Sequence, residues 1–343
     1  RDRSVSRGLG DVYKRQIDAY PFVPNNQDER IVRCLEILHI QAQGLATRLS
    51  KIHCKDVVIG ISGGLDSTLA LLVCHEAFKI NNYDSKGIHA ITMPGFGTTK
   101  RTKSNAQILM DLLHVSSEEI SIVDGVNQHF KDIHHNPEVH NITYENSQAR
   151  ERTQILMDLS NAYNAIVVGT GDLSELALGW CTYNGDHMSM YAVNASVPKT
   201  LVRYIVESVA LKDEILHDVL MDICDTPVSP ELLPPDKNGK IAQKTEEVLG
   251  SYDLHDFFLY QMLRHHDEPK KIYDLACVAF KDVEKETIKK AITTFYNRFF
   301  TQQFKRNCMP DGVKVGTVSV SPRGDLRLPS EIEFEEFLFG DKQ

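Results

Sequence analysis

Residues 62–67, with the sequence SGGLDS, combine two glycines, two hydroxyls and one carboxylate between two apolar runs. Gly63 and Gly64 allow a tight turn and a close approach of a ligand to the backbone. Ser67 and Thr68 come where a helix is expected to begin, and the free N–H groups and dipole of a helix N-terminus favour an anion. The stretch therefore predicts phosphate binding, with an ordinary turn between strand and helix as the alternative. It has neither the lysine of the G-x-x-x-x-G-K-S/T loop nor the G-x-G-x-x-G spacing.

Asp66 stands among the groups that are expected to hold phosphate. A carboxylate beside phosphates is unfavourable unless a cation lies between them, because like charges repel. Mg²⁺ takes carboxylate and phosphate oxygens as ligands. Asp66 is therefore predicted to bind Mg²⁺, and capping of the helix that follows is its alternative role.

The elements that would position these groups alternate between strands and helices. This order predicts an α/β fold with a doubly wound, mostly parallel sheet that carries helices on both faces, followed by a helical C-terminal part from about residue 215. In such sheets ligands lie beyond the carboxyl ends of the strands, so the loops after Ile61, Met93 and Val168 should share one rim. The polar, proline-rich stretch 225–240 is expected to be a mobile loop. Strands are expected at 57–61, 87–93, 120–123 and 165–169, and helices at 31–49, 68–77, 104–113 and 150–163.

The amino-acid composition favours a soluble globular protein over a nucleic-acid-binding or membrane-spanning one. The 343 residues are 42% hydrophobic and 25% charged, as in a soluble globular protein, and the net charge of −9 gives no electrostatic basis for binding nucleic acid. No apolar run approaches the ~18 residues of a membrane span. Seven scattered cysteines without a C-x-x-C spacing predict reduced thiols and a cytoplasmic location.

The first sixteen residues differ from the rest, because they carry five basic and two acidic residues with little apolar periodicity. They lack the apolar core of a signal peptide. We expect residues 1–19 to be a disordered or non-native extension, with a targeting tail as the alternative. One domain is then expected over 20–330 and a short tail over 331–343.

The loop at 62–67 resembles the pyrophosphate loop of the N-type ATP pyrophosphatases, which cleave ATP between the α and β phosphates. With four further stretches it resembles the NAD synthetase family, and in particular its glutamine-dependent branch, over roughly residues 20–330. The resemblance implies an adenine nucleotide α-hydrolase-like fold and a ligase of NAD biosynthesis. The implied reaction amidates deamido-NAD through an adenylated nicotinate carboxylate and releases AMP and pyrophosphate. The four stretches are ENSQAR (145–150), the run from GTGDLSE to SVPKT (169–200), KTEEVLGSYDLHDFFLY (244–260) and FKRNCMPDGVKV (304–315).

The resemblance also implies roles for single residues around ATP. Asp66, Glu175 and Lys199 would be catalytic, with Asp66 and Glu175 as the Mg²⁺ ligands and Lys199 reaching the phosphates. Asp172, three residues before Glu175, would either support the metal or compensate a helix dipole. The ATP-binding residues would be Gly60, Ile61, Ser62, Gly63, Gly64, Leu65, Asp66, Ser67, Thr170, Lys199 and Thr226, and a loop at 98–101 could close over the triphosphate.

A second implied group would hold deamido-NAD. Trp180, the single tryptophan, could stack on nicotinate or pack in a core. Tyr183 stands where the shorter, ammonia-only members tend to have lysine. Lys305 would reach the substrate only across a subunit interface or from a folded-back tail. The full set is Asn146, Glu175, Trp180, Cys181, Thr182, Tyr183 and Lys305.

The resemblance implies a homodimer and, in the full-length protein, a separate nitrilase-like glutaminase domain. Only 65 residues precede Asp66, so such a domain has no room there, and this chain is expected to use free ammonia. Two alternatives stay open. One is another amidating ATP pyrophosphatase, similar to GMP synthetase, and the other is a nucleotide-binding remnant without catalysis.

Overall fold

The computed structural model of the chain describes residues 17–97, 100–226 and 249–333. Residues 1–16, Thr98, Thr99, most of the loop expected at 225–240 and the end of the C-terminal tail lie outside these ranges, as do the side chains of Lys100 and Arg101. The domain limits expected at residues 20 and 330 stay predictions.

Five parallel strands form one sheet, which confirms the predicted fold class. The order across the sheet is β3-β2-β1-β4-β5, so the chain winds outward from β1 first to one edge and then to the other. This reversal lies between the neighbouring strands β1 and β4, and crevices at such points are where α/β sheets bind ligands. The strands are β1 (Val57–Gly60), β2 (Ile88–Thr92), β3 (Ser116–Glu119), β4 (Ile166–Gly169) and β5 (Tyr191–Ala192).

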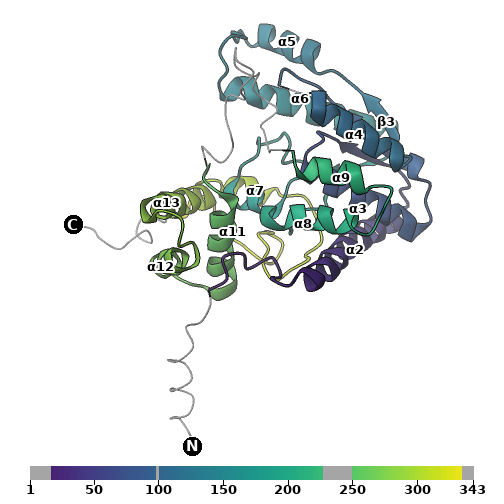
Figure 1. Cartoon of the computed structure of the whole chain (residues 1–343). Coiled ribbons are helices and arrows are strands. Elements are labelled where there is room, and N and C mark those ends of the chain that lie inside the picture. Colours follow the sequence, from purple (N-terminus) through teal and green to yellow (C-terminus); the bar gives the residue numbers. More distant parts are fainter. Residues whose placement is uncertain (1–16, 98–99, 227–248, 334–343) are drawn as a thin grey trace, which may run out of the picture.

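Helices cover both faces of the sheet (Figure 1). Alternate residues of β1 point to opposite faces, so Val57 and Ile59 join the core beneath α2, α3, α4, α8 and α9, whereas Val58 joins the core beneath α5 and α6. Both cores are apolar, which explains why the sequence of β1 is an uninterrupted apolar run. The bounds are α2 Gln27–Lys51, α3 Leu65–Asn81, α4 Lys100–Leu112, α5 Val123–Asp132, α6 Ile142–Ala162, α7 Leu173–Leu178, α8 Lys199–Ala210 and α9 His217–Cys224.

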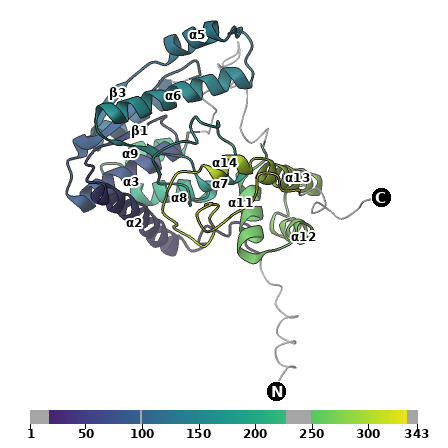
Figure 2. The ribbon, with the colours of Figure 1, turned by 180° about the vertical axis from the view of Figure 1, so that it is seen from behind.

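The helical C-terminal part packs beside the sheet and has its own core, in which aromatic residues such as Phe257, Phe258 and Phe295 are wholly buried. Helix α7 contributes Leu173 and Leu178 to this core, so it joins the C-terminal part to the sheet (Figure 2). The bounds are α11 Tyr252–Tyr260, a π-helical turn Gln261–His265, α12 Pro269–Ala279, α13 Lys285–Thr301 and α14 Gln303–Asn307.

One predicted strand was wrong. The apolar residues at 120–123 do not form a strand, since β3 occupies Ser116–Glu119 and Val123 begins α5. Strand β3 is a mostly exposed edge strand with the sequence SSEE, held by its backbone pairing to β2, and such a strand needs no apolar face. The two-residue β5 was not predicted at all, because two residues are too few to show a period.

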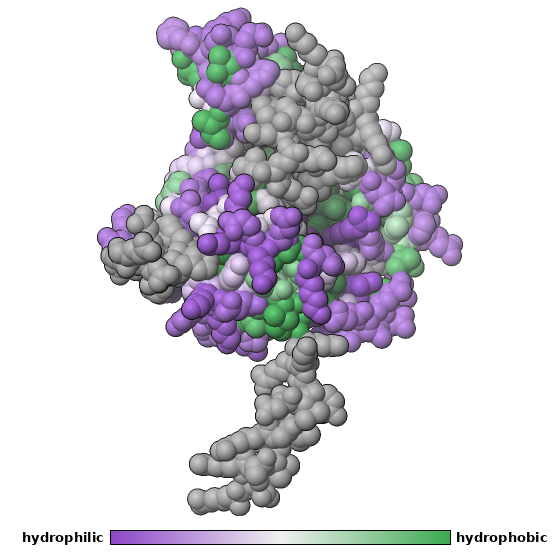
Figure 3. Space-filling view, turned by 60° about the vertical axis from the view of Figure 1, so that its left-hand side comes forward, coloured by the Kyte–Doolittle hydropathy of each residue, from purple (hydrophilic) through white to green (hydrophobic). Residues whose placement is uncertain are grey.

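The surface drawn in Figure 3 is largely hydrophilic, with smaller apolar areas between the polar residues. Within the described ranges, no helix has both the length and the apolar character that a membrane crossing requires. All seven cysteines are free thiols, as the sequence predicted.

Candidate active site

The predicted phosphate loop connects β1 to α3 at the carboxyl end of the sheet. Gly63 has a φ of 86°, which glycine adopts without strain, and this turn brings the chain into the first residue of α3. The Ser62 hydroxyl accepts from the Gly64 N–H at 3.2 Å and lies 3.1 Å from the Ser67 hydroxyl, which donates to the Gly64 carbonyl. The loop is thus braced by its own side chains, with Ser62 exposed at the surface.

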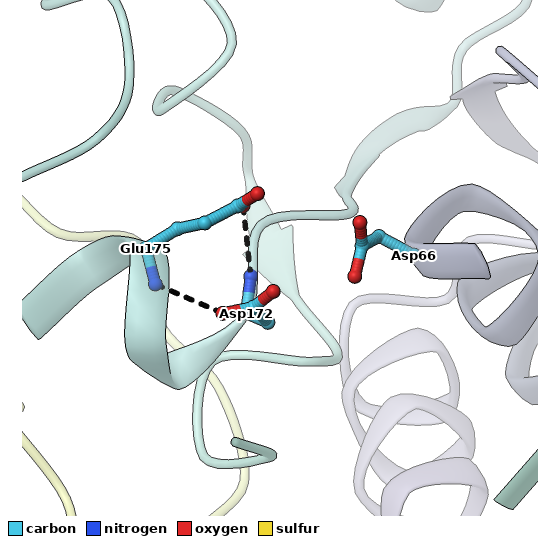
Figure 4. A group of neighbouring side chains, drawn as sticks. All are labelled: Asp66, Asp172 and Glu175. Carbon is cyan, nitrogen blue, oxygen red and sulfur yellow. Dashed lines mark hydrogen bonds between the residues drawn. The ribbon is translucent and has the colours of Figure 1, made fainter. Parts of the chain in front are cut away.

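Three carboxylates meet beside this loop (Figure 4). Asp66 lies in the first turn of α3, and Asp172 and Glu175 lie at the start of α7, just after β4. Asp172 caps α7 by accepting from the Glu175 N–H at 2.9 Å, and the Glu175 side chain returns to the Asp172 N–H, which forms a capping box. One oxygen of each carboxylate lies within 4.8 Å of the others. Asp66 and Glu175, far apart in sequence, therefore lie close together, and their role as Mg²⁺ ligands stays a prediction.

Lys199, the first residue of α8, places its ammonium among the three carboxylates. Its Nζ lies 2.7 Å from an oxygen of Asp66, 2.7 Å from Asp172 and 3.0 Å from Glu175. Burial alone lowers the pKa of Lys199, but the three carboxylates outweigh burial and raise that pKa well above its ordinary value. Burial, and then the charge of Glu175, raise the pKa of Asp172, and burial also raises the pKa of Glu175. One ammonium therefore does not neutralise this cluster.

The cluster fits a divalent cation. Asp66 Oδ1 is buried and finds no hydrogen-bond partner among the described residues, although its other oxygen pairs with Lys199. A buried carboxylate oxygen without a partner is unfavourable, and a cation would satisfy it. Because all three side chains offer hard oxygen ligands, they suit Mg²⁺. For Asp172 the sequence left open whether it supports the metal or compensates a helix dipole. In the structure Asp172 caps α7 and also belongs to the carboxylate cluster.

Apart from Glu175, which belongs to the carboxylate cluster, the residues expected to bind deamido-NAD lie around the other end of α7. The Thr182 hydroxyl donates to Asn146 Oδ1 at 2.8 Å, and Lys305 donates to the carbonyl of Gly179 at 2.8 Å and to that of Cys181 at 2.7 Å. Lys305 belongs to α14, so in this chain the C-terminal part folds back onto α7 without help from a second subunit.

The two aromatic residues of this stretch differ in their surroundings. Trp180 packs against the C-terminal core, and the Arg298 guanidinium lies 5.0 Å from the centre of its ring. Tyr183 is 44% exposed and contacts His187 and Phe304. Tyr183 is thus the more exposed of the two aromatic residues.

Comparison with known proteins connects this geometry to a family. Residues 37–308 match the NAD synthase family. This chain belongs to the NAD synthase family. It is 41% identical to the glutamine-dependent NAD(+) synthetase of Mycobacterium leprae and 39% identical to that of Mycobacterium tuberculosis strain H37Rv. These matches cover 93% and 96% of the present chain, respectively. The chain spans 51% and 53% of the length of these relatives.

Solved structures confirm the fold. The glutamine-dependent NAD(+) synthetase of Cytophaga hutchinsonii superimposes with a TM-score of 0.73 at 19% identity, over 89% of this chain and 55% of that one. The NH3-dependent NAD synthetase of Campylobacter jejuni gives a TM-score of 0.56 at 20% identity, over 81% of this chain and 97% of that one. Members of both nitrogen-donor types thus share the architecture described above.

Two of the ATP residues predicted for this NAD synthase domain belong to different parts of the fold. The Thr170 carbonyl, just after β4, accepts from Asn194 Nδ2 at 3.1 Å, close to the carboxylates. Thr226 donates to the Asp222 carbonyl at the end of α9. Among the described residues no contact joins Thr226 to the phosphate loop, so its role stays a prediction.

Asp186 is a candidate site residue that the sequence did not predict. It accepts from the Thr182 N–H at 2.7 Å, and burial raises the pKa of its carboxyl group. It lines a small cavity together with Glu175 and Cys181, so it lies between the carboxylate cluster and the predicted deamido-NAD residues. The signal that could have found it is an acidic residue inside an otherwise uncharged run, WCTYNGDHM.

Three cations hold the C-terminal end of α7 in this domain. Their N–H groups donate to carbonyl groups that have no partner within the helix. Their positive charges also interact favourably with the partial negative charge of the helix C-terminus. All three come from α13 and α14, which follow α7 by more than a hundred residues. The bonds run from Arg298 Nε to Leu178 O (3.0 Å), from Lys305 Nζ to Gly179 O (2.8 Å) and from Arg306 Nη1 to Ala177 O (2.6 Å).

Asp256 connects α11 to the starts of α7 and α8. Its buried carboxylate accepts from the Ser174 hydroxyl, from the Thr200 N–H at 3.0 Å and from the Thr200 hydroxyl at 2.7 Å. The Ser174 hydroxyl in turn accepts from the Lys199 N–H at 2.8 Å. Burial outweighs these hydrogen bonds and raises the pKa of Asp256 to about 6.

We expect Asp256 to give stability a distinctive pH dependence. Since its folded-state pKa is raised, the folded protein binds the extra proton between about pH 4 and pH 6, and the stability from this group is lost as pH rises through that window. The unfolding free energy of wild type minus that of Asp256→Asn should therefore fall by up to roughly 3 kcal/mol from pH 4 to pH 7. Urea unfolding across this range measures it, and a difference that is flat or rises with pH would contradict the assignment.

Proposed function

We propose that this chain amidates deamido-NAD to NAD⁺ with ATP and ammonia. The observation that carries the proposal is the cluster of Asp66, Asp172, Glu175 and Lys199 beside a phosphate loop at the switch point of the sheet. The M. leprae and M. tuberculosis relatives bear the name glutamine-dependent NAD(+) synthetase, which supports it.

The chemistry needs two transfers. A nicotinate carboxylate oxygen attacks the α-phosphorus of ATP, and the bond from that phosphorus to pyrophosphate breaks. Ammonia then attacks the carboxyl carbon of the adenylate, AMP leaves with the former carboxylate oxygen, and the nitrogen loses a proton to become the amide. Charge accumulates on pyrophosphate in the first transfer, so positioning and electrostatic stabilisation are the main catalytic terms.

The residues of the chain divide this work. The backbone N–H groups at 62–64 and the Ser67 hydroxyl would hold the leaving pyrophosphate. The ammonium of Lys199 supplies a positive charge that no pH near neutrality removes, since its pKa is raised. Asp66, Asp172 and Glu175 would hold Mg²⁺, which supplies charge neutralisation for the phosphates when bound.

The nicotinate end of the substrate would lie at the far end of α7. There Thr182 donates to Asn146, and Lys305 donates to the Cys181 carbonyl. Asp186, which accepts from the Thr182 N–H, lines a cavity together with Glu175. A cytoplasmic location, a homodimer and a separate glutaminase domain in the full-length protein belong to the same proposal. The length of the mycobacterial relatives, about twice that of this chain, supports the additional domain.

The nitrogen donor provides the test of this function. Purified chain with ATP, Mg²⁺ and deamido-NAD should form NAD⁺ from ammonium chloride at about 20 mM, above common KM values of up to ~1 mM, and at least tenfold more slowly from glutamine. Because unprotonated ammonia is the nucleophile, the rate at limiting ammonium should rise toward alkaline pH.

Three outcomes of this assay separate the alternatives. Efficient turnover on glutamine free of ammonia would contradict the proposed donor. Pyrophosphate release that deamido-NAD does not stimulate would favour another amidating pyrophosphatase, and no release under any condition would favour a nucleotide-binding remnant.

A further inference from the structure

Asn194 joins the two segments that carry the carboxylate cluster. It follows β5 and is wholly buried. Its Nδ2 donates to the Asp66 carbonyl at 2.9 Å and to the Thr170 carbonyl at 3.1 Å. One amide group therefore bonds both to the first turn of α3 and to the chain leaving β4, just before Asp172.

Gln41 on α2 fixes the orientation of this amide. Gln41 is also wholly buried, and its Nε2 donates to Asn194 Oδ1 at 3.0 Å and to the Val193 carbonyl at 2.8 Å. Since the Asn194 oxygen accepts from Gln41, its NH₂ group must be the side that faces the two carbonyls, which accept only. The pair thus forms a directed chain of hydrogen bonds from α2 to the cluster.

The separation of the carboxylates depends on this contact. Asp66 comes from the β1 side of the crevice, and Asp172 and Glu175 come from the β4 side. Mg²⁺ requires ligand distances of about 2.0–2.1 Å in near-octahedral geometry, so shifts of a few tenths of an ångström between the two sides weaken binding. Residues that orient metal ligands without touching the metal commonly change affinity by about 10- to 100-fold.

We infer that Asn194, oriented by Gln41, is a positioning residue that sets the distance between Asp66 and the carboxylates of α7 for divalent cation binding. This inference rests on the proposed function. A role in folding alone would instead lower stability and leave the affinity of the folded protein for the cation unchanged.

The test measures metal binding directly. Mn²⁺ binding is followed by electron paramagnetic resonance in the presence of α,β-methylene-ATP, which cannot be cleaved between the α and β phosphates. Asn194→Ala should weaken Mn²⁺ binding about tenfold. Gln41→Ala should weaken it in the same direction but less, and the double variant should equal Asn194→Ala, because Gln41 acts through Asn194.

Asn81→Ala is the matched control. Asn81 lies at the other end of α3, where its amide donates to the Ala46 carbonyl of α2 at 2.9 Å. This variant also loses an amide-to-backbone contact between elements, so it controls for lost stability, and its Mn²⁺ affinity should stay within about twofold of wild type.

The outcomes separate the inference from the function on which it rests. Wild-type Mn²⁺ affinity in folded Asn194→Ala would overturn the inference. If Asn194→Ala does not fold, wild-type Mn²⁺ affinity in Gln41→Ala would overturn it. In either case the proposed function would stand, because wild-type protein would still release pyrophosphate. Equal loss in Asn81→Ala would also overturn it. Wild type that neither binds Mn²⁺ with the analogue nor releases pyrophosphate from ATP would overturn both.

Discussion

Asp66→Asn and Glu175→Gln are each expected to lower pyrophosphate release at least ~1000-fold at ordinary Mg²⁺ concentrations. Each change would remove a charged ligand from the proposed Mg²⁺ site, whose cation would contribute several kcal/mol to the stabilisation of charge on the phosphates. The fold should be retained, because Lys199 keeps two of its three carboxylate partners in either variant. A coupled assay for pyrophosphate, with thermal unfolding followed by circular dichroism, measures both quantities.

Asp56→Asn is the control for these variants. Asp56 lies directly before β1, at the opposite end of the strand from Asp66, where it pairs with His89 at 3.0 Å. Its replacement removes one negative charge, as Asp66→Asn does, but away from the carboxylate cluster. The rate of pyrophosphate release should therefore stay within about twofold of wild type. Near-wild-type rates for both Asp66→Asn and Glu175→Gln would show that these carboxylates bind no essential metal.

Arg306→Met should have the largest effect on stability, lowering the unfolding free energy by about 3–5 kcal/mol. Arg306 is wholly buried and donates to carbonyls of Leu176, Ala177 and Phe299 and to the Gln303 side chain. Methionine fills much of the volume but leaves these buried acceptors without donors. Denaturant unfolding of purified protein measures the change.

Arg327→Met is the matched change at the surface. Arg327 is exposed, and its replacement should alter the unfolding free energy by no more than about 0.5 kcal/mol. Arg306→Lys should recover only part of the loss, because a single ammonium cannot reproduce the forked geometry of guanidinium. Equal stability of Arg306→Met and wild type would refute the role assigned to this side chain.

The parts of the site that follow strands could be predicted from the sequence. Asp66 and Glu175 come after apolar runs that form neighbouring parallel strands, and the carboxyl ends of such strands share one edge. The helix α2 and the turn at Gly63 could likewise be predicted, from the amphipathic pattern of one segment and the backbone freedom of one glycine. These features depend only on short-range periodicity and backbone preference, which the sequence displays directly.

The remaining parts depend on contacts between distant segments. Lys305 bonds to Gly179 across 126 residues, and Asn194 bonds to Asp66 across 128, without any periodic pattern that marks such pairs. The placement of Lys199 among carboxylates was not predicted either, because the phosphates were the expected partners. In β3, backbone pairing to β2 outweighed side-chain character, so an apolar run nearby was mistaken for the strand.

The parallel pairing of β1 with β4 has a consequence for which mutations this site tolerates. Val57 pairs with Ile166 and Ile59 with Val168, and the carboxylates follow these strands within a few residues. An insertion or deletion of one residue inside either strand would shift the chain by about 3.3 Å and exchange the faces of the side chains that follow. That shift is larger than a metal–ligand bond, so selection for activity should eliminate length changes in β1 and β4 even where the folded state survives. Length changes in surface loops such as that between α5 and α6 escape this constraint, because no carboxylate of the cluster depends on their length.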